Sequence, residues 1–375
     1  MKSNGIDLLA DYVFLSKYSQ RKKDGNLERW NETIDRIYDM HKVKLEKLNL
    51  LNEKVALMIE NAKKLECDKK ILSSQRGRQF ASPKETSGIL KHEAKLYNCC
   101  STYVDRPEVF SEIMYLLLCG CGVGYSLHKE FINRLPVVKN LNNFGEIEYE
   151  IEDSIEGWAE SIRILMSSLF NGVMPKISFN HIRPEGALID GKFIAPGPEP
   201  LIKAHKHIKD VMKIAQGRKL KSIEIHDIIC YIADSVVSGG VRRSAMIALF
   251  DKDDELMLRA KTGNWWAENP QRAMANNSIL STLSDPIPYN ELKEKLQVIR
   301  QFGEPGFVNV KDYKYTVNHC GETVMEPSIN GKTGFAFCNL VEINAERVKT
   351  KEEFLEACRI ASFVATVQAL YTDFK

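Results

Sequence analysis

The sequence predicts an α/β fold in which a mainly helical N-terminal region precedes a parallel β-sheet. Two patterns carry this prediction. From about residue 26 to about residue 70 the chain is charged and places apolar residues at helical spacing. From about residue 97 onward, short apolar segments of strand length alternate with amphipathic segments of helix length. Strands and helices in alternation are typical of a parallel sheet covered by helices.

The N-terminal region, residues 1–95, is expected to consist mainly of helices. The apolar residues that share a helical face there are Trp30, Ile34, Ile37, Tyr38, Val43, Leu45, Leu48 and Val55. Charged residues fill the positions between them. A charge run of this kind is more often a solvated helix face than a ligand site.

The sheet region is expected to begin at residue 96. Its expected strands are 97–104, 122–127, 246–250 and 307–310, and its expected helices are 107–118, 158–170 and 226–237. Pro107 suits the first turn of a helix, because the N–H that proline lacks would have no partner there. Asn171-Gly172 is expected to end the second helix and Ser238-Gly239-Gly240 the third.

Composition excludes several classes of protein. The chain has 375 residues, enough for one large domain or two ordinary ones, and apolar residues make up 44% of it. Its 52 basic and 50 acidic side chains nearly cancel, so no global field favours nucleic acid or a membrane. The sequence begins without the apolar core of a signal peptide, and no apolar run approaches the roughly 20 residues that span a bilayer. We expect neither nucleic acid nor membrane as a partner.

The cysteines point to a reducing compartment. The chain has nine, an odd number, scattered without a secretory signal and without any Cys-x-x-Cys pair. This distribution argues against a disulfide framework and against a zinc ribbon, and it favours the cytoplasm. Any cysteines that work together must therefore be brought together by the fold.

Three cysteines lie in contexts that differ from an ordinary core position. Cys99 follows Asn98 in an expected strand, and Cys338 lies in an apolar strand-like segment. Cys320 lies in a polar loop between Asn318 and Glu322, a poor place for a packing cysteine and a good one for a cysteine with a chemical role. We interpret the other isolated cysteines as small buried hydrophobes. They are Cys67, Cys119, Cys121, Cys230 and Cys358.

These segments carry a family resemblance. Val317-Asn-His-Cys-Gly-Glu322 resembles the Asn-Pro-Cys-x-Glu finger-loop motif of ribonucleotide reductases, and Asn98-Cys99 and Phe337-Cys-Asn-Leu340 resemble the segments that carry their redox cysteines. Further matches follow in the family's order. They are Met114–Ser126, Glu152–Trp158, Ile182–Gly186, Gly239–Ala245, Ala275–Ser278 and Gly303–Gly306. The resemblance runs from about Phe14 to the end of the chain.

The resemblance implies a fold and a missing portion. It implies that residues 96–375 form the first half of a ten-stranded α/β barrel, with the central finger loop and the first strand of the second half. The rest of the barrel, its phosphate-binding turn and the C-terminal cysteine pair of the family would lie outside this chain. We therefore expect activity to need a complementary C-terminal half chain.

The resemblance also implies roles for five residues. Cys320 would carry the thiyl radical that removes the C3′ hydrogen of a ribonucleotide, Glu322 would act as general base, and Asn318 would orient the substrate hydroxyls. Cys99 and Cys338 would form the dithiol that reduces C2′ and closes to a disulfide. Cys100 is a second candidate for the position of Cys99.

A second group of residues is expected to recognise nucleotides. The family uses a glycine-rich loop to read the substrate base together with an allosteric effector, and the residues that match it or could line its pocket are Gly239, Gly240, Arg242, Arg243, Asn276 and Asn277. Arg242 or Arg243 could contact base or phosphate. Gly122-Val-Gly124 lacks the third glycine of a dinucleotide fingerprint, so we interpret it as close backbone packing. His319 replaces the usual proline of the finger loop, which removes a rigid φ constraint before Cys320. It also places a titratable group beside the radical site, where it could alter proton flow.

The resemblance is greatest to the adenosylcobalamin-dependent class, in Phe14–Ser19, Trp30–Thr33 and Gly120–Tyr125. We therefore expect adenosylcobalamin as cofactor. The alternative is a radical supplied by a separate metal-containing subunit. A ribonucleotide substrate, a nucleotide effector and a thioredoxin-like reductant are the other implied partners. The alternative function is a catalytically silent nucleotide-binding or interaction module of the same fold, but such a module has no chemical need for three cysteines and Glu322.

Overall fold

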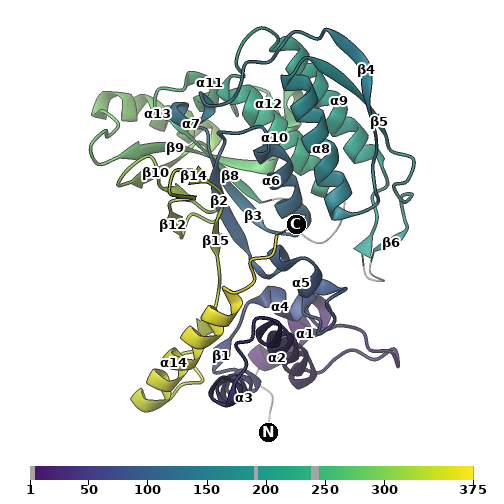
Figure 1. The fold of residues 1–375 in the computed structure, drawn as a ribbon. Coiled ribbons are helices and arrows are strands. Elements are labelled where there is room, and N and C mark those ends of the chain that lie inside the picture. The colour runs from purple at the N-terminus through teal and green to yellow at the C-terminus, as the bar shows by residue number, and fades with distance from the viewer. Residues whose placement is uncertain (1–4, 190–192, 238–244, 375) are drawn as a thin grey trace. The chain divides into compact units, whose positions relative to one another are not determined.

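The structure is a computed structural model that describes residues 5–189, 193–237 and 245–374 (Figure 1). The chain forms two compact units. One contains residues 5–98 and 338–374, and the other contains the described residues of 99–337. Within the described part of the chain, no helix is long and apolar enough to cross a membrane.

The first unit is mostly helical. Its elements before residue 98 are α1 (Gly5–Lys17), α2 (Trp30–Lys47), α3 (Glu53–Cys67), β1 (Ile71–Leu72), α4 (Gln75–Phe80), α5 (Gly88–Lys91) and η1 (Glu93–Leu96). Asn52 caps the start of α3, and its side chain accepts a hydrogen bond from the backbone N–H of Val55. Such a cap satisfies one of the N–H groups that the first helical turn leaves without a partner.

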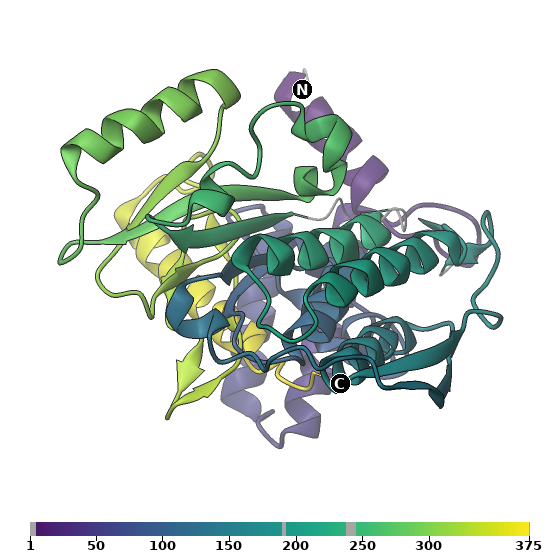
Figure 2. The ribbon, with the colours of Figure 1, turned by 90° about the horizontal axis from the view of Figure 1, so that it is seen from above.

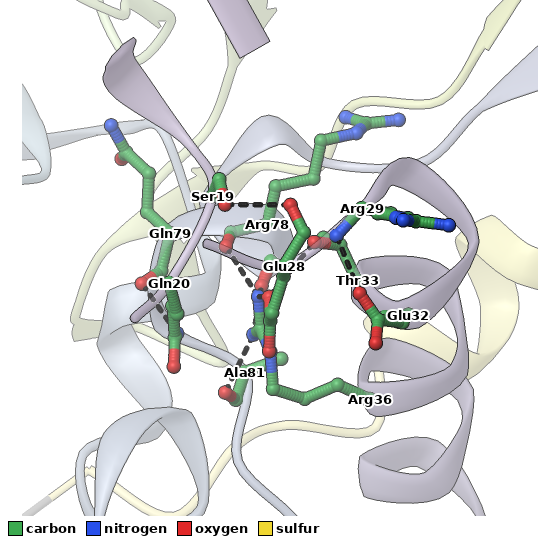
Figure 3. A network of polar contacts seen from close by, with 11 residues as sticks. Ser19, Gln20, Glu28, Arg29, Glu32, Thr33, Arg36, Arg78, Gln79 and Ala81 are labelled. Atoms are coloured by element: carbon green, nitrogen blue, oxygen red, sulfur yellow. Dashed lines mark hydrogen bonds and ion pairs between the residues drawn. The ribbon is translucent and has the colours of Figure 1, made fainter. Parts of the chain in front are cut away.

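A buried network of charges joins α2 to α4 (Figure 3). The Arg36 guanidinium pairs with the Glu28 carboxylate at 2.8 Å, and each side chain is little more than a tenth exposed. Arg36 also donates to the carbonyl oxygens of Arg78 and Ala81, at 2.9 and 2.8 Å. Because these carbonyls lie at the C-terminal end of α4, the guanidinium caps that helix end and complements its dipole. The Thr33 hydroxyl donates to Glu28 as well.

The last residues of the chain belong to this unit. β16 (Glu342–Ile343) pairs antiparallel with β1, and α14 (Lys351–Gln368) packs against α3. Tyr371 is fully buried, and its hydroxyl lies 2.8 Å from His41 Nδ1 on α2. These contacts are the reason that residues 338–374 group with the N-terminal helices.

The second unit is built on a sheet whose strand order, among the described residues, is β10-β9-β8-β3-β2-β15. Its strands are β2 (Cys99–Tyr103), β3 (Gly122–Ser126), β8 (Met246–Asp251), β9 (Ala275–Thr282), β10 (Gly306–Val310) and β15 (Ala336–Cys338). The pairs β2/β3, β3/β8, β8/β9 and β9/β10 are all parallel. The expected α/β fold with a parallel sheet is therefore confirmed.

Helices connect the parallel strands. They are α6 (Val109–Leu118), α7 (Lys129–Ile132), α8 (Ile155–Phe170), α9 (Glu199–Ile214), α10 (Ser222–Val237), α11 (Glu255–Leu258), α12 (Trp265–Glu268), η2 (Pro270–Met274) and α13 (Tyr289–Phe302). α6 packs against α8 and α10, and α9 packs against α10; Figures 1 and 2 show these helices side by side in blue to teal. α8 ends at Phe170 with Asn171 as its C-cap, and Gly172 follows with a φ of +76°, as the Asn-Gly pair predicts.

Short two-stranded sheets lie outside the main sheet. They are formed by β4 (Asn143–Glu150) with β5 (Val173–Ser178), β6 (Leu188–Ile189) with β7 (Phe193–Ile194), β11 (Thr316–Val317) with β12 (Val324–Met325), and β13 (Ser328–Ile329) with β14 (Lys332–Thr333). The β11/β12 pair carries the Asn-x-Cys-x-Glu motif.

The two faces of the main sheet have different neighbours. Successive side chains of a strand point to opposite faces. On β3, the Tyr125 hydroxyl reaches His226 Nδ1 of α10 at 2.8 Å, so Tyr125 marks the helix-covered face. Gly122 and Gly124 lie on the other face. That face also carries a hydrophobic cluster, which consists of Ile247, Leu249, Leu280, Val310 and Val317.

Candidate active site

The loop between β11 and β12 is a short hairpin, and we call residues 318–323 the finger loop. β11 and β12 pair antiparallel through Thr316 with Met325 and Val317 with Val324. The finger loop continues this pairing, because the Asn318 N–H donates to the Thr323 carbonyl at 3.3 Å. The Thr323 N–H in turn donates to Asn318 Oδ1 at 3.1 Å. The loop therefore has a defined closure.

The finger loop lies directly against β2 and β3. A Cβ atom built on Gly124 would stand 1.9 Å from the carbonyl oxygen of Val317, and one on Gly122 would stand 2.1 Å from Nδ1 of His319. A side chain at residue 124 would collide with backbone, and one at residue 122 would displace the His319 ring, so the two glycines let the loop approach the sheet. The Thr316 hydroxyl donates to the Ser101 hydroxyl of β2 at 2.7 Å. The expectation of close backbone packing at Gly122-Val-Gly124 is confirmed.

Asn318 joins two of the predicted catalytic side chains. It is 1% exposed, and its Nδ2 donates to Cys99 Sγ at 2.9 Å and to Glu322 Oε1 at 2.7 Å. Cys99 is the first residue of β2 and is also 1% exposed, whereas the Glu322 side chain is on the surface. The amide thus holds a buried thiol and an exposed carboxylate on its two N–H groups.

Cys320 lies at the tip of the finger loop. It is exposed, unlike the other eight cysteines, which are buried or half-buried. Its Sγ is 3.1 Å from Nε2 of His319. Gly321 follows with a φ of +80°, a backbone conformation that glycine adopts readily, and this residue turns the chain back toward Glu322.

Cys99 and Cys100 point to opposite faces of the sheet. Cys99 shares its face with Gly122 and the finger loop, because the two residues are partners in the parallel register. The Cys100 thiol donates instead to the Gly122 carbonyl at 3.7 Å, and burial together with the neighbouring Cys121 raises its pKa well above the usual range. A raised pKa suppresses the thiolate that disulfide chemistry uses. This geometry favours Cys99 over Cys100 for the role at the finger loop.

Cys338 ends β15, the edge strand that lies next to β2 in the sheet order. Its side chain is 6% exposed. The chain passes from the second unit into the first at this residue. The pairing of Cys338 with Cys99 stays a prediction.

The nucleotide-recognition residues divide into two groups. Gly239, Gly240, Arg242 and Arg243 lie outside the described residues. Asn276 and Asn277 are neighbours on β9 and therefore face opposite sides of the sheet. Asn276 pairs in register with Ile247 of the finger-loop face and is exposed. Asn277 is 2% exposed on the helix-covered face, and its Oδ1 has no hydrogen-bond partner among the described residues.

The second unit contains a pocket of about 130 Å³, and no residue of the finger loop is among its described lining residues. Its described lining comes from three stretches that are distant along the chain, with Leu118 in addition. They are residues 153–155 with Trp158, residues 182–183 with 195–197, and the end of α10 at Ser235 and Val236. Asp153, Ser154 and Arg183 give it a polar side, and Arg183 Nε pairs with Asp153 Oδ2 at 2.6 Å.

Sequence reasoning missed two features of this geometry. It noted His319 as a replacement for proline and as a titratable group beside the radical site, but it did not foresee the contact of His319 with the Cys320 thiol. It also assigned no role to the matched segments around Asp153 and Arg183, which meet in one pocket. Both segments match the same family, and this shared match was a signal that they could form one site.

Comparisons with known proteins agree with the resemblance. No family model matches the sequence. The chain is 26% identical over 98% of its length to a probable adenosylcobalamin-dependent ribonucleoside-triphosphate reductase of Dictyostelium discoideum, of which it covers 52%. It is 26% identical over 93% of its length to the adenosylcobalamin-dependent ribonucleoside-triphosphate reductase of Euglena gracilis, of which it covers 50%. The corresponding Lactobacillus acidophilus enzyme is 28% identical over 70% of the chain.

The fold gives a matching result. A crystal structure of a B-12 dependent (class II) ribonucleotide reductase superposes with a TM-score of 0.78 at 20% identity, covering 96% of this chain and 59% of that one. The chain spans about half the length of the curated relatives that it matches. It is therefore similar, in sequence and in fold, to a part of the adenosylcobalamin-dependent ribonucleotide reductases.

Proposed function

We propose that this chain contributes the radical-bearing part of a ribonucleotide reductase active site, which converts ribonucleotides to deoxyribonucleotides. One observation carries the proposal. Asn318 holds the Cys99 thiol and the Glu322 carboxylate on one amide, while Cys320 is exposed at the tip of the same loop. A module without catalytic activity has no need for this arrangement of a buried thiol, a carboxylate and an exposed thiol.

The finger loop would perform the first part of the reaction. A thiyl radical on Cys320 removes the hydrogen atom from C3′ of the ribose, and the sulfur becomes a thiol. The Glu322 carboxylate takes the proton of the 3′-hydroxyl as general base, which suits its exposed position two residues from Cys320. Asn318 orients the carboxylate through its 2.7 Å hydrogen bond and keeps the loop closed.

The dithiol would complete the reduction. The 2′-hydroxyl leaves as water after it takes a proton from the Cys99 and Cys338 pair. The two sulfurs then give two electrons and one further proton to the substrate and close to a disulfide. Glu322 returns its proton to the 3′-oxygen, and Cys320 returns the hydrogen atom to C3′. Burial of Cys99 supports this role, because shielding from water protects radical intermediates.

The proposed cofactor is adenosylcobalamin, as in the names of the relatives. When bound, it supplies the radical. The residue that must face it is Cys320, whose exposure at the loop tip fits this requirement. Asn318 and the two glycines under the loop hold that thiol in place.

We propose that the active enzyme also contains the half of the relatives' sequence that this chain does not match. That half would lie on the same polypeptide or on a separate one. In this proposal, the five parallel strands β2, β3, β8, β9 and β10 form the first half of a ten-stranded barrel. The unmatched half of the relatives' sequence would supply the other wall and the groups that anchor the substrate phosphates, whose binding energy positions the ribose. A thioredoxin-like protein would reduce the disulfide after each turnover.

The proposed effector site is the pocket at Asp153 and Arg183. Ser235 and Val236 line it and immediately precede the glycine-rich segment that is expected to read nucleotides. Its size and its charged side chains are compatible with part of a nucleotide. A nucleotide bound there would contact the residues that precede the segment with Arg242 and Arg243 in the sequence.

Oxidative trapping tests the cysteine assignment on this chain. Diamide takes two hydrogen atoms from a dithiol, so the folded chain should form an intrachain disulfide between Cys99 and Cys338, identified by peptide mapping. A disulfide needs Cα atoms within about 7 Å of each other. The bond should persist in Cys100→Ser and in Cys358→Ser. A disulfide that joins Cys100 to either residue, or none in the wild type, would contradict the assignment.

A further inference from the structure

The finger loop carries a second side chain next to the reactive thiol. His319 Nε2 lies 3.1 Å from Cys320 Sγ, within hydrogen-bonding distance for a sulfur. The finger loop holds the two residues in fixed register, because Asn318 and Thr323 close it by two hydrogen bonds. A neighbouring imidazole is one of the arrangements that convert a cysteine to its nucleophilic thiolate.

The sheet leaves space for this imidazole at Gly122. The His319 ring occupies the space where residue 122 would carry a Cβ, with Nδ1, Cε1 and Cγ at 2.1, 2.3 and 2.6 Å from that position. Only a glycine at residue 122 leaves room for the ring. The position of His319 beside Cys320 is therefore determined by β3 as well as by the loop.

We propose that His319 is the proton acceptor of Cys320, so that the pair exists in part as thiolate and imidazolium near neutral pH. The thiol proton moves from Sγ to Nε2, and no other bond changes. The sulfur then attacks soft electrophiles: with iodoacetamide a C–S bond forms, iodide leaves, and the imidazolium proton is released to solvent. In the proposed reductase, the imidazolium would return its proton to the sulfur before Cys320 gives up a hydrogen atom.

The groups around Cys320 and His319 determine whether the thiolate of Cys320 is favoured or opposed. The Glu322 carboxylate belongs to the same loop, and its negative charge opposes a thiolate at Cys320. Cys99 on β2 is held by the same Asn318 amide, and the Tyr103 hydroxyl farther along that strand donates to the Lys314 carbonyl. Gly122 and Gly124 of β3 lie against the loop and carry no charge, and β12 consists of the uncharged Val324 and Met325. Within the finger loop, Glu322 is therefore the charge that opposes the proposed proton transfer.

Alkylation kinetics test the proposal without substrate or cofactor. The full chain is treated with iodoacetamide from pH 5 to pH 10, and modification at each cysteine is followed by mass spectrometry. Cys320 should reach half its maximal rate at about pH 7.5 or below, against about 8.5 for an ordinary thiol. His319→Gln should move that midpoint upward by about one pH unit or more, and Glu322→Gln should move it downward. Half-buried Cys358 is the internal reference, and modification of buried Cys99 would report unfolding.

A second variant keeps both residues of the pair and moves only the ring. Gly122→Ala should shift the Cys320 midpoint in the same direction as His319→Gln, because the new methyl group displaces the imidazole. Gly334→Ala is the matched control, since nothing lies within 4 Å of its Cβ position. An unchanged midpoint in His319→Gln, or an ordinary midpoint in the wild type, would overturn the proposal. Either result leaves the reductase assignment intact, and a failure of that assignment leaves this one intact.

Discussion

Gly124 and Val317 approach so closely that a Cβ on residue 124 would lie 1.9 Å from the carbonyl oxygen of Val317. This contact joins the middle of the parallel sheet to the strand that leads into the finger loop. Because real Cβ atoms essentially never come within 3 Å of such an atom, any side chain at residue 124 must push the loop away. The sequence of β3 thus determines where the motif with Cys320 lies.

The first prediction follows from that contact. Gly124→Ala should lift β11 from the sheet, because the obstructing atom is backbone and cannot rotate aside. Amide hydrogens of residues 316–325 should exchange faster with deuterium, while those of α8 should be unaffected. Gly334→Ala should leave exchange unchanged in both regions, since its Cβ position is open. Wild-type exchange rates in Gly124→Ala would show that the loop does not rest on β3.

The second prediction concerns Asn318. Asn318→Ala removes the donor to Cys99 and Glu322 and the acceptor for the Thr323 N–H, and it should lower the free energy of unfolding by about 1–3 kcal/mol. Asn318→Asp keeps an oxygen for Thr323 but loses both donors. Hydrogen exchange at the Thr323 amide should therefore accelerate in the alanine variant and stay slow in the aspartate variant. Equal exchange in the two variants would argue against loop closure by the Asn318 side chain.

The third prediction concerns the buried ion pair of Figure 3. Arg36→Met should lower the free energy of unfolding of the first unit by about 3–5 kcal/mol, because it leaves the Glu28 charge buried without a partner. Denaturation with urea, followed by the fluorescence of nearby Trp30, measures this. The matched control is Lys22→Met, which breaks the far more exposed pair with Glu32 and should have little effect. Comparable loss in both variants would contradict the role of burial.

The fourth prediction is a dependence of stability on pH. Burial lowers the pKa of His205 and of His226 to about 3, from an ordinary value of 6.5. Between these values the unfolded chain binds more protons than the folded one, so the free energy of unfolding falls as the pH drops below 6.5. Each histidine should account for about 2 kcal/mol of loss between pH 7.5 and pH 5.

Urea titrations at those two pH values check this. His205→Gln should reduce the loss, because glutamine does not titrate in this range and its amide can still form a hydrogen bond with the Ser161 hydroxyl. His181→Gln should not reduce it, because the His181 side chain is 62% exposed. A loss that is identical in wild type and His205→Gln would sink the explanation.

Much of the second unit could be predicted from sequence. The strands at residues 99–103, 122–126 and 246–251 lie in the segments where apolar runs of strand length were expected. Alternating strand and helix patterns are local signals, so they can be recognised in the sequence without knowledge of the tertiary contacts. The start of α8 was placed too late, at residue 158 instead of Ile155, because the Ser154 cap was overlooked.

The remaining features depend on contacts between distant residues. The distinction between Cys99 and Cys100 needs the strand register, because a shift of one residue exchanges the two faces. The grouping of residues 338–374 with the N-terminal helices rests on Tyr371 and on the β1/β16 pair, which no periodicity encodes. The position of the His319 ring depends on the contact of the finger loop with Gly122, which is about 200 residues away in sequence.

The central claim is that Cys320 starts the reaction and that Cys99 and Cys338 supply its electrons. The most direct measurement uses the chain together with the polypeptide that carries the other half of the relatives' length, adenosylcobalamin, a ribonucleoside triphosphate and a thioredoxin-like reductant. Deoxynucleotide formation and the paramagnetic radical signal are followed in parallel. Wild type should give both, Cys320→Ala neither, and Cys99→Ser or Cys338→Ser the signal without sustained product. Deoxynucleotide formation by Cys320→Ala would contradict the account.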